Sequence, residues 1–353
     1  MFHSHWQSLR SFFGVTHKKS GTVQRPKTIL RVEQLEDRCV PSATPTLDLT
    51  TAGAIGEINH VIFRQLDQQP AGSGVIHSFV RLDSPGNSTT EQGFNTDARP
   101  LQFDENNSPV FTRSLALSSV PTITIDRVVY REFLLDINQK SSQPLLSLDE
   151  LRFFAGAAPN LSGYDTGSNT LGGLPAAYDL GAGNWIELNA RLSHGSGQSD
   201  MAAYVPDSVF AGQSYVYLYS KFGVNVSANG GYEEWATTST VAANTGVISG
   251  YVDTTAGTPI AGVTVTIFID LNNNDQVNNN EVFFTTTTDS NGFYSFTGLF
   301  TGVTYTEIVS KPANTSTTTY TGTPSPLDVT LTSGTPDVMN VDFSFQATTV
   351  TRV

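Results

Sequence analysis

Short runs in which apolar and polar side chains alternate fill most of this sequence after residue 48. Clear examples cover residues 58–63, 75–82, 122–125 and 185–192. Alternation with a period of two is typical of a β-strand that buries one face. Turn signals such as Ser84-Pro85-Gly86-Asn87 separate the runs at short intervals, which favours a β-sandwich over a βαβ fold. The sequence therefore predicts an all-β protein.

The length and composition limit how this β-structure is organised. The chain has 353 residues, enough for two or three domains, and only 14% of them are charged. Its single cysteine, Cys39, cannot form an internal disulfide or a structural zinc site, and no run approaches the ~18 apolar residues of a membrane helix. We expect one β-sandwich domain at residues 48–242, with a split near Pro159 as the alternative, followed by a second domain at 246–346.

Residues 1–43 differ from the rest in charge. They carry seven basic and three acidic side chains, +4 in total, so a net charge of −13 leaves −17 on the remaining residues. A basic arm for nucleic acid would be opposed by this acidic body, so we interpret the segment as an export leader. Its apolar stretch, residues 11–15, is short for a secretory signal.

The end of this segment resembles a known motif. Residues 30–42 read L-R-V-E-Q-L-E-D-R-C-V-P-S, similar to the leader motif of many large surface and secreted proteins of planctomycete bacteria. Residues 133–139, 146–150, 199–206, 215–223 and 233–236 also resemble a module of planctomycete surface proteins, one that implies no particular activity. The resemblance implies a secreted or cell-surface location, while a short amphipathic helix is the alternative for the motif.

Several residues of the 48–242 domain have both a functional and a structural interpretation. Tyr215, Tyr217 and Tyr219 alternate along one run, so they are candidates to stack on sugar rings, but a strand buried on both faces gives the same pattern. Four oxygen-bearing residues are candidates to gather around a cation or a glycan, with solvated side chains at strand ends as the alternative: Asp136, Asn138, Asp149 and Glu150.

No catalytic group is indicated by spacing. His194 beside Gly195-Ser196-Gly197 lacks a G-x-S-x-G context and an orienting acid, so we expect no enzymatic activity.

The clearest motifs lie in residues 246–346. Runs at 247–252, 260–267 and 288–296 predict three strands, and Asn291-Gly292 predicts a tight hairpin turn. The runs I-S-G-Y-V, I-A-G-V-T-V and T-D-S-N-G-F-Y-S-F resemble the B-domain of SD-repeat surface proteins, which is related to the B-type repeats of collagen adhesins. This resemblance implies an immunoglobulin-like, prealbumin-type β-sandwich that serves as a stalk.

A twelve-residue loop at 270–281 predicts a calcium site. Calcium takes six to eight oxygen ligands, and a D-x-[DN]-x-[DN] start with Glu at position twelve supplies them. Gln276 would bind through its backbone carbonyl, and Asn278 would bind directly or through a water molecule. We assign the side-chain oxygens of four further residues as ligands: Asp270, Asn272, Asn274 and Glu281. SD-repeat B-domains carry a similar calcium loop. A flexible Asn-rich hairpin is the alternative.

Two departures from the usual loop pattern weaken this site. Asp275 replaces the glycine of the sharp turn, and Asn278 replaces a more usual Asp. With two carboxylate ligands, we expect a dissociation constant of about 10⁻⁴ to 10⁻³ M.

These features together predict a secreted or cell-surface structural protein, adhesin-like, with a calcium-stabilised stalk. A glycan-binding, lectin-like surface protein is the alternative. We expect a partner in the extracellular matrix, the cell wall or a glycan, and neither nucleic-acid binding nor membrane insertion. The only lysine of the second domain, Lys311, follows the strand patterns, so we expect no Lys–Asn isopeptide crosslink there. Nor do we expect covalent wall attachment, since residues 348–353 contain no sorting motif.

Overall fold

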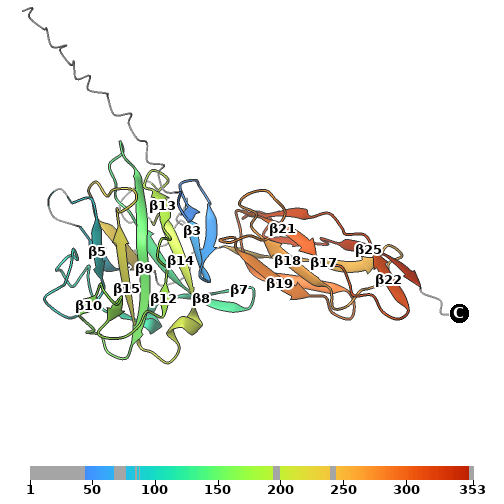
Figure 1. Ribbon diagram of the computed structural model, residues 1–353, viewed down its shortest axis with the longest axis horizontal. Coiled ribbons are helices and arrows are strands. Elements are labelled where there is room, and N and C mark those ends of the chain that lie inside the picture. The colour runs from blue at the N-terminus through green and yellow to red at the C-terminus, as the bar shows by residue number, and fades with distance from the viewer. Residues whose placement is uncertain are drawn as a thin grey trace, which may run out of the picture. The chain divides into compact units, whose positions relative to one another are not determined.

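A computed structural model describes residues 44–66, 77–83, 86, 88–193, 199–238 and 244–349. The predicted leader at residues 1–43, with Cys39, lies outside these residues. The described part consists of β-strands and two short 3₁₀ turns, Leu117–Ser119 and Asp207–Phe210 (Figure 1). The predicted all-β class is confirmed. Within the described ranges, no helix has the length and apolar character to cross a membrane.

Two mainly antiparallel sheets form the first sandwich. In the β9 sheet the order is β1-β13-β9-β15-β5, with β12 added to β9 and β6 added to β15. In the β8 sheet the order is β2-β3-β14-β8-β16-β4, with β7 added to β8. The strands of the β9 sheet are β1 Leu47–Asp48, β5 Glu91–Phe94, β6 Leu115–Ala116, β9 Leu145–Gly156, β12 Tyr178–Asp179, β13 Ile186–Asn189 and β15 Tyr215–Phe222. Those of the β8 sheet are β2 Ile55–Ile58, β3 Val61–Gln65, β4 His77–Leu82, β7 Thr122–Ile125, β8 Val128–Asp136, β14 Met201–Pro206 and β16 Glu233–Thr237. A small hairpin joins β10 Tyr164–Asp165 to β11 Thr170–Leu171.

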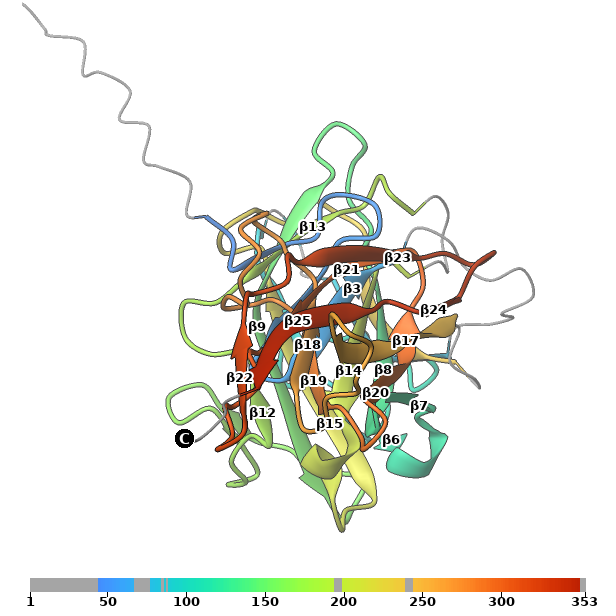
Figure 2. The same cartoon turned by 90° about the vertical axis from the view of Figure 1, so that its right-hand side faces the viewer.

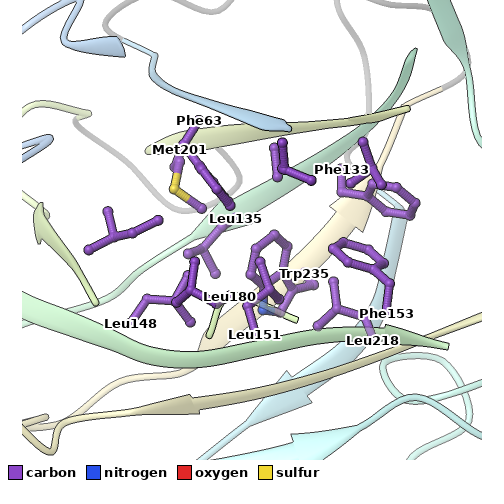
Figure 3. Packing of buried hydrophobic residues seen from close by; sticks show 14 of the residues in the cluster. Phe63, Phe133, Leu135, Leu148, Leu151, Phe153, Leu180, Met201, Leu218 and Trp235 are labelled. Carbon is purple, nitrogen blue, oxygen red and sulfur yellow. The ribbon is translucent and has the colours of Figure 1, made fainter. Parts of the chain in front are cut away.

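The core of this sandwich lies between the two sheets. Phe133 of the β8 sheet meets Phe153 of the β9 sheet, and their rings are 4.7 Å apart (Figure 3). Trp235 is fully buried and satisfies its indole N–H by donating to the Ser220 hydroxyl, 3.1 Å away. Along each strand, every second side chain points into the space between the sheets. The alternation predicted from the sequence therefore produces this core.

One predicted strand is a hairpin instead. Residues 58–63 alternate as a single strand would, but β2 ends at Ile58 and β3 begins at Val61. Asn59 and His60 form the turn with φ angles of 51° and 68°. Two successive positive φ angles are those of a type I′ turn, for which Asn is favoured at the first position.

The second sandwich begins at β17 (Figure 2). Its β17 sheet has the order β20-β17-β25-β22 with β24 added to β17, and its β18 sheet has the order β19-β18-β21-β23. The β17 sheet comprises β17 Thr245–Thr254, β20 Phe293–Phe300, β22 Thr318–Thr321, β24 Asp337–Met339 and β25 Phe343–Thr349. The β18 sheet comprises β18 Thr264–Phe268, β19 Phe283–Thr287, β21 Val303–Val309 and β23 Leu327–Leu331.

Two predictions for this sandwich need correction. The strand expected at 260–267 begins only at Thr264, because Gly262 turns the chain with a φ of 73°. The turn at Asn291-Gly292 is not a hairpin within one sheet: it connects β19, which pairs with β18, to β20, which pairs with β17. Only Gly292 has a positive φ, 73°, and the Asp289 carboxylate accepts the backbone N–H groups of Asn291 and Phe293. The turn therefore crosses between the sheets.

The outer face of the β8 sheet packs against the second sandwich. Ile62, Leu134 and Tyr204 belong to the same buried cluster as Phe300 and Tyr305. The rings of Tyr204 and Phe300 are 4.9 Å apart. The middle of the β8 sheet is thus buried on both faces, and residues 44–349 form one compact unit.

Candidate metal centre

The predicted calcium loop connects β18 to β19. These strands pair antiparallel, with Phe268 opposite Phe283, so the loop at 270–281 closes one end of the β18 sheet. Most of its side chains are exposed, as expected for a polar connection. The exception is Glu281, which is 3% exposed.

Asp270 organises the first half of the loop. Its Oδ1 accepts the backbone N–H groups of Asn272 and Asn274, each at 3.2 Å, and its Oδ2 accepts that of Asp275 at 2.8 Å. Desolvation raises the pKa of this carboxyl, but the backbone N–H donors of Asp275, Asn274, Asn272 and Asn273 outweigh it, so the pKa of Asp270 lies below its usual range. The carboxylate is therefore kept ionised, the form that binds a cation.

Glu281 closes the loop from the other end. Its Oε1 accepts the N–H of Leu271 at 3.1 Å and its Oε2 accepts the N–H of Asn278 at 2.7 Å. Both carboxylate oxygens are thereby held at the base of the loop.

The amide residues between these carboxylates are partly brought together. Asn278 Nδ2 donates to Asn274 Oδ1 at 2.9 Å and to the Gln276 carbonyl at 2.6 Å, so three of the assigned residues meet there. The amide hydrogens of Asn278 bind the same two oxygens that we assigned to calcium. In the part of the chain that the structure describes, the Asn272 side chain makes no hydrogen bond, and it extends into solvent.

Backbone geometry resolves the difficulty raised by Asp275. Asn273 and Asp275 have φ angles of 55° and 59°, both in the left-handed region. Asn and Asp enter this region more readily than other residues with a side chain, so Asp275 makes the sharp turn without glycine.

The donor set suits a hard, weakly bound cation. In the described ranges, no three His, Cys, Asp or Glu side chains gather as a metal site would require. A calcium ion in this loop would therefore depend on two carboxylates together with amide and backbone oxygens. Such oxygens fit calcium and do not fit zinc, which prefers nitrogen and sulfur.

The tyrosines of β15 do not form an exposed platform. Tyr217 and Tyr219 are 0% and 1% exposed, and the Tyr219 ring stacks on Tyr164 with centroids 4.0 Å apart. Tyr217 donates its hydroxyl to the Ala158 carbonyl. The alternative of a strand buried on both faces is therefore correct for Tyr217 and Tyr219, whose rings are not available to sugars, whereas Tyr215 at the start of β15 is half-buried.

The four oxygen-bearing residues of the first sandwich do not converge on one point. Asn138 donates weakly to Asp136, at 3.4 Å, and Asp136 is buried rather than solvated. Asp149 accepts the backbone and side-chain N–H groups of Asn225, whereas Glu150 binds Arg152 at 2.5 Å. These carboxylates hold neighbouring segments in place. His194 lies outside the described residues.

The sequence did not reveal two buried carboxyl groups. Burial raises the pKa of Asp200 to about 8, although the Ile137 N–H donates to this carboxylate. Burial also raises the pKa of Glu307 to about 8, and the nearby Tyr294 hydroxyl lowers it only partly. Each group is thus mostly protonated at neutral pH.

The described part of the first sandwich includes cavities at its loops and on the β9 sheet. One, of about 810 Å³, is lined by loop residues that include Glu91, Lys140 and Asn229. A second, of about 510 Å³, is lined in part by Arg152, Asp179 and Lys221. Arg152 bridges Glu150 and Asp179, so the charged groups of the second cavity largely neutralise one another.

Comparison with known proteins gives no family assignment. No family model matches the chain, and no curated protein matches it. Among solved structures, BcpA, the major pilin subunit of Bacillus cereus, is similar at 15% identity and a TM-score of 0.25, over 62% of this chain and 60% of that one. A point variant of BcpA matches at 14% identity and a TM-score of 0.25, over 81% of this chain and 85% of that chain.

A third solved structure is a point mutant of the shaft pilin spaA from Lactobacillus rhamnosus GG. It matches at 12% identity and a TM-score of 0.21, over 75% of this chain and 100% of that chain. TM-scores this low do not establish a shared fold, so these pilins carry no argument about the function of this chain.

Proposed function

We propose that this chain is a secreted or cell-surface structural protein, adhesin-like and without enzymatic activity, whose second sandwich is stabilised by calcium. The observation that carries the proposal is the 270–281 loop, where Asp270 and Glu281 are already oriented by five backbone N–H donors. A preorganised loop loses little conformational entropy when a cation enters it, so a small ligand charge suffices for binding.

The partner of such a protein would be extracellular. A component of the matrix, the cell wall or a glycan fits the expected location, and the net charge of −13 disfavours polyanions such as nucleic acid. Fractionation of native cells tests this part of the proposal. Recovery of the protein in the cytoplasmic fraction would refute it.

The calcium site is tested by thermal unfolding. At about tenfold over its dissociation constant, calcium adds ~1.4 kcal/mol to the free energy of unfolding, a rise in Tm of roughly 2–4 °C. We expect this rise with millimolar calcium chloride and not with the same concentration of EDTA. Glu281→Ala is expected to abolish it.

Two further variants separate ligand loss from loop damage. Glu281→Gln retains a hydrogen-bond acceptor but removes the charge, so it should also abolish the calcium-dependent rise. Asp275→Asn removes a charge from the same loop without removing an assigned ligand, and it should keep most of the rise. A parent protein whose Tm is the same in calcium and in EDTA would refute the site.

A further inference from the structure

Among the described residues, the hydrogen bonds between the 270–281 loop and the first sandwich all involve Asn280. The Glu57 N–H of β2 donates to the Asn280 carbonyl at 2.9 Å, and Asn280 Nδ2 donates to the Thr46 carbonyl at 3.3 Å. β2 is an edge strand of the β8 sheet, so the outward N–H of Glu57 has no strand partner on that side in the described part of the chain. Asn280 supplies the missing acceptor.

Close approach at this contact depends on Gly56. A Cβ atom added to Gly56 would lie 2.9 Å from the Asn280 carbonyl oxygen, and it would also overlap the Leu47 side chain. Gly56 does not have a positive φ, so its lack of a side chain serves the contact rather than the backbone conformation.

Asn280 is held by the calcium loop itself. It precedes Glu281, whose two carboxylate oxygens join the loop's second and ninth residues, Leu271 and Asn278. Asn280 has a φ of 67°, a conformation that is costly for a free chain. Whatever fixes Glu281 therefore also fixes the direction of the Asn280 carbonyl.

The remaining contacts between the sandwiches lie on other elements. Arg64 of β3 donates to the Thr301 carbonyl at 2.7 Å, with its guanidinium 5.0 Å from the centre of the Phe300 ring. The Asp126 N–H donates to the Thr297 carbonyl at 2.8 Å. These contacts involve β20 and the turn that follows it, so among the described residues Asn280 alone links the 270–281 loop to β2.

We propose that calcium in the 270–281 loop fastens the second sandwich to β2 of the first through the Asn280 carbonyl. The proposal rests on the calcium site proposed above. A cation that binds Glu281 restricts the backbone of its neighbour, which strengthens the hydrogen bond from Glu57. By linkage, a weaker contact at β2 must lower calcium affinity by the same factor.

Hydrogen exchange of the full chain measures this coupling. With calcium chloride in place of EDTA, the Glu57 amide is expected to exchange at least about fivefold more slowly, the lower end of typical coupling. Amides of β5, in the other sheet, should keep their rates. In Glu281→Gln, calcium should have no effect at Glu57.

The reverse effect is measured by calorimetric titration with calcium chloride. Gly56→Ala places a methyl group against Asn280, so we expect its calcium affinity to fall by a similar factor. Gly334→Ala is the matched control, because a Cβ there has no neighbour nearer than 4.0 Å; its affinity should equal that of the parent.

The outcomes distinguish the two proposals. If the parent binds calcium but neither the Glu57 exchange rate nor the affinity of Gly56→Ala changes, the coupling is wrong and the calcium site stands. If the parent binds no calcium, both are wrong. If Gly56→Ala does not fold, the exchange measurement on the parent still decides.

Discussion

Replacing Glu307 by Gln should stabilise this protein at neutral pH. Glu307 lies in β21 with both carboxyl oxygens buried, and the Tyr294 hydroxyl offsets the effect of this burial on its pKa only partly. The Tyr294 hydroxyl is near, but it donates its single proton to the Val341 carbonyl. An ionised carboxylate in this position would be poorly solvated, so the protonated form is favoured.

The sign and size of the effect follow from the pKa. Folding raises the pKa of Glu307 from 4.5 to about 8, so between these values the folded state binds more protons than the unfolded state. Stability is therefore fully present below about pH 4.5 and is lost as the pH rises towards 8. Each pH unit in this window corresponds to about 1.4 kcal/mol, so the loss from pH 5 to pH 8 is roughly 3–4 kcal/mol.

Urea unfolding at several pH values gives the measurement. Gln has the shape of a protonated Glu and does not titrate, so the two proteins should be similarly stable at pH 5. Glu307→Gln should become more stable than the parent by roughly 3–4 kcal/mol at pH 8. All samples contain EDTA, so that calcium bound at the 270–281 loop does not contribute to the stability at any pH. Parallel stability curves from pH 5 to pH 8 would show that Glu307 ionises without penalty, and would refute this reasoning.

Three further predictions concern other positions. Asp200→Asn should reproduce the pH effect in the first sandwich, since the pKa of Asp200 is also about 8. In the double variant with Glu307→Gln the two gains in stability should add. A double variant no more stable than either single variant would contradict independent titration. Tyr204→Ala should lower the free energy of unfolding in urea by roughly 3–5 kcal/mol. A double-mutant cycle with Phe300→Ala should give a coupling energy of ~0.5–1.5 kcal/mol, and a coupling energy of zero would mean that the two rings do not pack on each other. Gly292→Ala should lower the free energy of unfolding by at least ~1–3 kcal/mol, because φ at this position is 73° and a Cβ would lie 2.6 Å from the Val252 carbonyl oxygen. Asn291→Ala is the milder control, and equal stability of the two variants in thermal melts would refute the prediction.

The sequence predicted the β-structure well where a strand buries one face. It predicted poorly where local chemistry competes with periodicity. Residues 58–63 alternate like one strand, yet Asn59 and His60 adopt positive φ angles and divide it into two. Val61, Ile62 and Phe63 are all buried because β3 is covered on both faces, so the pattern after the turn did not reveal the break either.

Glu307 illustrates a signal that is present in the sequence. Val303, Tyr305 and Val309 point inward from β21, and Glu307 occupies the remaining position of the same alternation. The alternation alone therefore places a carboxyl group in the core. Its raised pKa comes from burial by segments distant in the sequence, which no spacing within β21 indicates.

The calcium loop shows the same division between local and distant information. Its hydrogen bonds join residues within the loop, so a twelve-residue pattern was enough to propose which residues would act as ligands. Asn280 was not among them, because its side-chain partner, Thr46, is 234 residues away in the sequence. Its role depends on how the β8 sheet packs, and that packing depends in turn on β14.

In β14, the run Met201-Ala202-Ala203-Tyr204-Val205 has no polar alternation, because Ala203 faces the first core while Ala202 and Tyr204 face the second sandwich. A strand of this kind needs a cover on both faces. The second sandwich therefore covers the outer face of the β8 sheet. If the chain serves as the stalk proposed above, force on one sandwich would be transmitted to the other through buried apolar contacts such as Tyr204–Phe300 and through the hydrogen bond at Asn280.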